Sequence, residues 1–212
     1  HGFFWEKHIL IVCFGIPEEK LKEIGYTSKY DLPKKFIDDK FNISCKCSIS
    51  LNDVNMGDPI RLYDSVNNPD EKIHLIIFFW KQEGNFKNVI KTYEIDITDK
   101  KVLLFGDITK KDLEDLRDKV REVPNKRSPT AEERKVMYEF RDKLHEKKGA
   151  LRLDIKCNSQ QSRIQCTIHN FTTKFIVNKT LKIIEENDVN KFRNKEIPKY
   201  EGGGRVFNKK PQ

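Results

Sequence analysis

The sequence has no run of 18 apolar residues, so it offers no candidate for a membrane-spanning helix. The apolar segment 8–14 is too short to cross a bilayer and lacks the small residues of a signal-peptide cleavage site, so we interpret it as a buried strand. With 35% charged residues the chain is too polar for a membrane protein, and with 37% hydrophobic residues it is too apolar for a disordered one. These absences indicate a globular protein whose 212 residues suffice to bury a core.

Motifs that mark common reaction centres are missing as well. The chain contains no H-E-x-x-H metal pattern and no G-x-S-x-G nucleophile pattern, and the glycine triplet 202–204 neither follows a predicted strand nor opens a predicted helix. His74 lies in an apolar stretch, where a histidine is more often part of the core than a general base. We therefore expect a non-enzymatic protein with no cofactor and no metal, and the alternative is an enzyme without a familiar motif.

Cysteine is scarce, and its number is odd, so the cysteines cannot all pair within one chain. Their spacing does not complete a zinc site. Apart from Cys13, they fall on the inward rows of predicted strands, which makes disulfides between core strands one interpretation and small buried hydrophobic residues the other. The disulfide candidates are Cys45, Cys47, Cys157 and Cys166.

Strict alternation of apolar and polar residues over 41–51 predicts a strand with one buried and one solvated face. The alternation puts Cys45 and Cys47 on the buried face and Asn42 on the solvated face. Apolar runs predict further strands at 73–80, with 60–63 as its hairpin partner, and at 89–97, 102–105, 151–157 and 164–168, while 180–192 fits a strand or a helix.

Two helices are indicated by their start signals. Thr109 with Asp112, and Thr130 with Glu133, have the spacing of capping boxes, and each pair precedes an apolar stripe of helical period. The linker between the two segments is short, so we expect an antiparallel helical hairpin over 109–149. A shorter helix is predicted at 17–24, with proline at its first turn.

These elements predict an α+β fold, with a mainly antiparallel β-sheet or sandwich and an inserted helical hairpin. We expect one domain over 1–201, with a sub-boundary near 106 as the alternative, followed by a basic glycine-containing tail at 202–212.

The net charge of +8 is concentrated in the second half of the chain. Residues 100–212 hold 28 Lys and Arg against 17 Asp and Glu, whereas residues 1–99 hold 13 against 16. A basic half attracts acidic proteins and nucleic acids, although an ordinary lysine-rich surface has the same composition. The binding candidates in the last 24 residues are Lys191, Arg193, Lys195, Lys199, Arg205, Lys209 and Lys210.

Three N-x-S/T sequons exceed the roughly one expected by chance and favour the secretory route. The glycosylation candidates are Asn42, Asn170 and Asn178. Because the chain begins at His1, we expect a processed product, an engineered expression form or a piece of a longer chain.

We predict a non-enzymatic binding protein, secreted or in the secretory-pathway lumen, whose basic C-terminal half contacts an acidic protein or other acidic macromolecule. The alternative is an intracellular nucleic-acid-binding or ribonucleoprotein factor.

Overall fold

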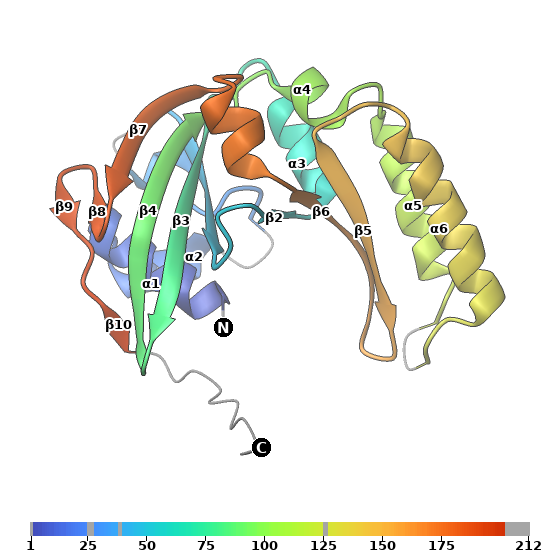
Figure 1. Cartoon of the computed structure of the whole chain (residues 1–212), viewed down its shortest axis with the longest axis horizontal. Helices are drawn as coiled ribbons and strands as arrows, with labels where there is room; N and C mark the ends of the chain where they lie inside the picture. Colours follow the sequence, from blue (N-terminus) through green and yellow to red (C-terminus); the bar gives the residue numbers. More distant parts are fainter. Residues whose placement is uncertain (1, 25–27, 38–39, 125–126, 202–212) are drawn as a thin grey trace.

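The computed structural model describes residues 2–24, 28–37, 40–124 and 127–201 (Figure 1). Helices and strands each take up 35% of the chain, which confirms the predicted α+β class. Among the described residues, we find no helix that combines the length and the apolar character needed to cross a membrane.

Sheet A is mixed rather than purely antiparallel. Its central strands, β3 (Ile73–Glu83) and β4 (Phe86–Asp96), form the longest hairpin, and β1 (Asn42–Ser48) pairs with β3 in parallel. The crossover from β1 to β3 runs through β2 (Val54–Gly57) and α3 (Pro59–Val66). On its other side, β4 pairs with β7 (Lys182–Asp188) and β10 (Tyr200–Glu201). Strand β1 is therefore an edge strand of the sheet, and on its outer edge Ile43 forms an isolated bridge with Leu32.

Sheet B consists of β2, β6 (Gln161–Ile168) and β5 (Leu151–Asn158), all antiparallel. The predicted helical hairpin packs on one face of β5 and β6 as α5 (Lys110–Arg121) and α6 (Ala131–His145). Both predicted capping boxes are present, because the Thr109 and Thr130 side chains accept hydrogen bonds from the backbone N–H of Asp112 and Glu133. In Figure 1 the two helices lie on the far side of sheet B from sheet A.

Two hydrophobic cores lie on opposite faces of sheet A. The larger one joins sheet A to sheet B and to α3, α5 and α6, and it draws on residues such as Phe79, Leu116 and Ile168. The smaller one lies under α1 (Gly2–Phe14) and contains Cys45 and Phe78. The first core contains residues from both sides of position 106, and the single-domain prediction stays a prediction.

Segment 8–14 belongs to helix α1, so the prediction of a strand there was wrong. The segment is apolar on nearly every side, so it has no period that separates a helix from a strand. Helix α1 ends where Gly15 takes a positive φ of 65°. Helix α2 (Glu18–Ile24) follows, as predicted from Pro17.

Two other predicted strands are also helices. Helix α3 replaces the strand at 60–63, because Asp58 accepts hydrogen bonds from the backbone N–H of Ile60 (2.9 Å) and Arg61 (3.2 Å) and Pro59 occupies the first turn. The segment 102–105 lies in the one-turn helix α4 (Lys101–Phe105), which ends at Gly106 with φ 58°. The remaining short elements are η1 (Lys34–Phe36), the π-helix η2 (Thr172–Val177), β8 (Lys191–Phe192) and β9 (Lys195–Glu196).

The cysteines form no disulfide bond, which corrects the disulfide prediction. All five are free thiols, and none lies close enough to another to be joined. In the β5–β6 hairpin, Cys157 is opposite Ser162, whereas Cys166 is opposite Leu153, so the two sulfur atoms are separated along the strands. Cys45 and Cys47 lie on sheet A and the other pair on sheet B. Burial instead makes Cys13, Cys45 and Cys166 small members of the cores.

Candidate functional site

The outer edge of β1 holds two neighbouring carboxyl groups, those of Asp31 and Glu6. The backbone N–H of Ile43 points away from β3 and donates to the carbonyl oxygen of Leu32 (2.9 Å). Two residues further on, the N–H of Cys45 donates to Asp31 Oδ2 (2.8 Å), and after another two the N–H of Cys47 hydrogen-bonds to the Glu6 carboxyl group. Side-chain carboxylates therefore replace the main chain as partners of the sheet edge.

Lys46 lies between these carboxyl groups and is the centre of the cluster. Its Nζ is 3.1 Å from Asp31 Oδ2 and donates to the carbonyl oxygen of Cys45 (2.9 Å). The hydroxyl of Ser44 donates to the same Asp31 oxygen (3.3 Å). Burial opposes the charge of Lys46, but Asp31 and Glu6 outweigh it and raise its pKa, so the amine is a firmly charged ammonium group.

Glu6 has a pKa of about 7, well above the usual value for a carboxyl group. Burial beneath α1 is the main cause, and the negative charge of Asp31 adds to it, whereas Lys46 and the N–H of Cys47 pull in the opposite direction. A carboxyl group that titrates near neutral pH can exchange its proton for a cation, and pKa shifts of this kind are concentrated at functional sites.

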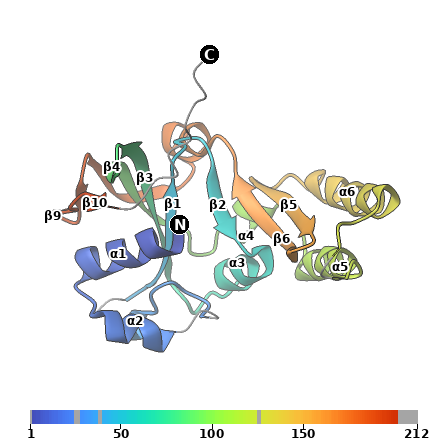
Figure 2. The same cartoon turned by 90° about the horizontal axis from the view of Figure 1, so that it is seen from below.

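The cluster opens into a pocket of about 600 Å³. Glu6 and Asp31 line it together with Arg61 at the start of α3 and with Arg163 and Gln165 of β6. A smaller pocket of about 110 Å³ contains Ser44 and Lys46 and shares Asp31 and Arg61 with the larger one. Residues of α1 and of both sheets therefore line the two adjoining pockets, and Figure 2 shows the neighbouring elements α1, β1, β2 and α3 from below.

The described residues include no group of three or more His, Cys, Asp or Glu side chains arranged to hold a metal ion. Asp31 and Glu6 could supply two oxygen ligands and leave the rest of a coordination shell to water and a substrate. Magnesium is bound in this way in phosphate-processing sites, by one or two carboxylates and the phosphate itself.

A second buried charged cluster lies beneath helix α1. The Glu94 side chain is only 1% exposed, and Arg193 donates to both of its oxygen atoms, at 2.7 and 2.9 Å. His74 Nδ1 lies 2.7 Å from Glu94 Oε1, and the Phe41 ring stacks on the imidazole with 3.5 Å between centroids. Because both carboxylate oxygens are occupied and aromatic rings cover His74 and Arg193, this cluster has the properties of a structural core network.

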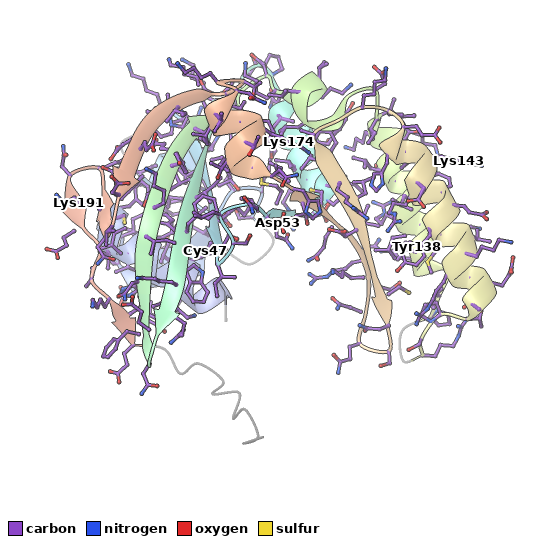
Figure 3. The ribbon with its side chains drawn as sticks, in the orientation of Figure 1. Cys47, Asp53, Tyr138, Lys143, Lys174 and Lys191 are labelled. Atoms are coloured by element: carbon purple, nitrogen blue, oxygen red, sulfur yellow. The ribbon has the colours of Figure 1, made fainter. Side chains whose placement is uncertain are left out.

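The predicted basic binding residues do not gather at the pocket. Lys191 is exposed on the β8–β9 hairpin, on the opposite side of sheet A from sheet B (Figure 3). Arg193 is bound to Glu94, and Lys195 donates to the carbonyl oxygen of Cys13 (3.0 Å). Lys199 is exposed. The remaining candidates, Arg205, Lys209 and Lys210, lie outside the described residues.

Two of the three sequon asparagines are exposed, namely Asn170 and Asn178. The solvent-facing position predicted for Asn42 was wrong, because its side chain is buried and its Oδ1 accepts a hydrogen bond from the N–H of Lys34 (3.0 Å). Use of the sequons stays a prediction.

The sequence analysis missed all three central residues of the site. Lys46 carried a usable signal, since it is the only charged residue in the alternating segment 41–51. Asp31 and Glu6 had no local pattern, because only the pairing at the edge of β1 brings them to Lys46. Comparison with other proteins supplies no further guide: no family model, no curated protein and no solved structure matches this chain.

Proposed function

We propose that this protein is a divalent-metal-dependent phosphodiesterase that hydrolyses nucleic acid, with Glu6, Asp31 and Lys46 at its reaction centre. The observation that carries the proposal is the ammonium group of Lys46 in the 110 Å³ pocket, held 3.1 Å from Asp31, which with Glu6 also lines the adjoining 600 Å³ pocket. Two carboxylates are a ligand set by which Mg²⁺ is held beside a substrate phosphate, and a lysine ammonium stabilises the charge that develops there.

The chemistry assigns a distinct role to each side chain. Asp31 and the ionised form of Glu6 would hold a Mg²⁺ ion, and that ion would supply activation of water and positive charge for the substrate phosphate. As water bonds to phosphorus it releases one proton to solvent, the bond from phosphorus to the leaving sugar oxygen breaks, and that oxygen takes up one proton from solvent. Lys46 is charged, so it stabilises the additional negative charge of the transition state rather than acting as a base.

The charge of the whole chain supports a polyanionic substrate. The net charge is +8, and Arg61 and Arg163 line the pocket. Arg61 donates to the carbonyl oxygen of Ser28 (3.3 Å) and Arg163 to Gln161 Oε1 (2.9 Å), so these hydrogen bonds leave their charges unneutralised. Nucleic acid is also the partner class of the alternative reached from the sequence. The prediction of a non-enzymatic secreted binding protein stays a prediction, and the free thiols remove the disulfide argument for it.

A cleavage assay tests the proposal. Purified protein, first treated with chelator, is incubated with supercoiled plasmid and with labelled RNA in EDTA, Mg²⁺ or Mn²⁺. We expect cleavage only with a metal ion, and a rate about 100-fold or more lower in Lys46→Ala. Lys143→Ala, which removes an exposed lysine of α6, is the matched control and should cleave at the wild-type rate.

Two results would contradict the proposal. The first is the absence of metal-dependent hydrolysis of either nucleic acid by the wild type. The second is cleavage by Lys46→Ala at the rate of Lys143→Ala, which would trace the activity to a contaminant or to another site.

A further inference from the structure

The β5–β6 hairpin presents one face that is polar throughout. Its two strands pair over their whole length, with Arg152 opposite Thr167 and Lys156 opposite Arg163. The reverse face is buried under α5 and α6 through residues such as Leu153 and Ile164. The side chains of the polar face are Arg152, Asp154, Lys156, Asn158, Gln161, Arg163, Gln165 and Thr167.

The positively charged side chains of this face form no ion pairs within the described part of the chain. Arg152, Lys156 and Arg163 are exposed, and none of them forms an ion pair with another described residue. The single acidic residue, Asp154, accepts a hydrogen bond from Thr167 Oγ1 (2.7 Å). Arg163 Nε donates to Gln161 Oε1 (2.9 Å), which orients the guanidinium group without neutralising it. The face therefore has an excess of cations that are free to meet phosphates.

The polar face continues into the candidate site. Arg163 and Gln165 line the same 600 Å³ pocket as Glu6 and Asp31. Figure 1 shows α5 and α6 on the outer side of the hairpin, while its other face is turned towards sheet A and α1. A molecule lying along the polar face would therefore also reach the Lys46 cluster.

We propose that the polar face of the β5–β6 hairpin docks into the major groove of duplex DNA and holds the duplex against the Lys46 cluster. This inference rests on the proposed function, because it assigns duplex DNA as the nucleic acid that is cleaved. A two-stranded β-ribbon fits the major groove, and arginine, asparagine and glutamine are the side chains that read guanine and adenine there. The face has no apolar side chain, which disfavours a protein partner, because protein interfaces are centred on buried apolar or aromatic anchors.

The test measures binding separately from cleavage. Fluorescence anisotropy of a labelled 30-base-pair duplex is recorded in EDTA for the wild type and for a variant with Arg152→Gln, Lys156→Gln and Arg163→Gln. We expect affinity about 10-fold or more weaker in the triple variant, and a slope of log K against log salt smaller by up to about 2.7, the value if all three cations contact phosphates. The matched control removes three exposed cations from the outer helix, Arg134→Gln, Lys135→Gln and Lys143→Gln, and should retain both the affinity and the slope.

The outcomes separate this inference from the proposed function. Duplex binding that depends on the polar face, without metal-dependent cleavage, supports the inference and contradicts the function. Metal-dependent cleavage that needs Lys46, together with equal binding by the two triple variants, contradicts the inference and leaves the function intact. Absence of duplex binding by the wild type, or preference for single strands, overturns the inference. The single variant Arg163→Gln and a thermal melt of each protein guard against misfolding.

Discussion

Two charged clusters lie on sheet A, and they differ in whether their carboxylate groups can still bind a further ligand. Both carboxylate oxygens of Glu94 are hydrogen-bonded by His74 and Arg193, and the Phe41 ring stacks on the His74 imidazole. Asp31 and Glu6 share Lys46 and face a pocket, where a further ligand has room. Burial of charge alone therefore does not mark a functional site. A functional site needs charge together with access and unfilled coordination.

The pKa values of the two buried glutamates shift in opposite directions. Burial would raise the pKa of Glu94, but hydrogen bonds from His74 and Arg193 outweigh it and hold the pKa below the usual value. For Glu6, burial outweighs Lys46 and the Cys47 N–H, and the pKa rises to about 7. The first glutamate is fixed as an anion, whereas the second can change its charge near neutral pH.

The largest effect that we expect is on activity and comes from Asp31→Asn. The substitution keeps the shape of the side chain but removes the charge that would hold the metal ion, so the rate of Mg²⁺-dependent cleavage should fall about 100-fold or more. Single-turnover assays at saturating enzyme measure this rate. Glu94→Gln, assayed under conditions where it is folded, serves as the control, and an equal loss in both variants would remove the distinction between the clusters.

The next effect is on stability and comes from Glu94→Ala. It leaves His74 and Arg193 without their shared anion, so the free energy of unfolding should fall by about 3–5 kcal/mol. Urea denaturation followed by circular dichroism gives the value. A loss below 1 kcal/mol would mean that water replaces the carboxylate at little cost, and the cluster would then not be a core network.

The third effect depends on pH and comes from Glu6→Gln. The folded-state pKa of about 7 exceeds the ordinary value of 4.5, so the folded protein binds the proton more tightly than the unfolded chain. Wild-type stability should therefore fall as pH rises from 4.5 to about 7, whereas the variant lacks this loss. We compare the free energy of unfolding of the variant with that of the wild type at each pH. Between pH 4.5 and pH 8, this difference should change by about 2–3 kcal/mol in favour of the variant.

Urea denaturation across this pH range measures the difference. Mg²⁺ should reduce it, because a cation favours ionised Glu6. A difference that is independent of pH would show that Glu6 titrates as an ordinary exposed carboxyl group.

The smallest effect concerns the aromatic cover of the second cluster. Phe41→Leu removes a ring that stacks on His74 and lies 5.4 Å from the Arg193 guanidinium carbon. The free energy of unfolding should fall by about 1 kcal/mol, with no change in the cleavage rate. A thermal melt and the plasmid assay check both parts, and reduced cleavage would indicate that the two clusters are coupled.

Local signals in the sequence predicted the helical hairpin and most of the strands. The capping residues Thr109 and Thr130 set the starts of α5 and α6, and the alternation at 41–51 identified β1. The site could not be predicted in the same way, because 40 positions separate Glu6 from Lys46 and only the edge of β1 joins them. The apolar segment 8–14 concealed the helix that carries Glu6, since only packing against sheet A distinguishes it from a buried strand.

The most direct test of the account is the cleavage rate of two single variants, each measured at a temperature where it is fully folded. Lys46→Ala should lose metal-dependent cleavage by about 100-fold or more, while Glu94→Ala, although less stable, should cleave within about threefold of the wild type. Equal losses in the two variants, or wild-type cleavage by Lys46→Ala, would contradict the assignment of the reaction centre to the edge of β1.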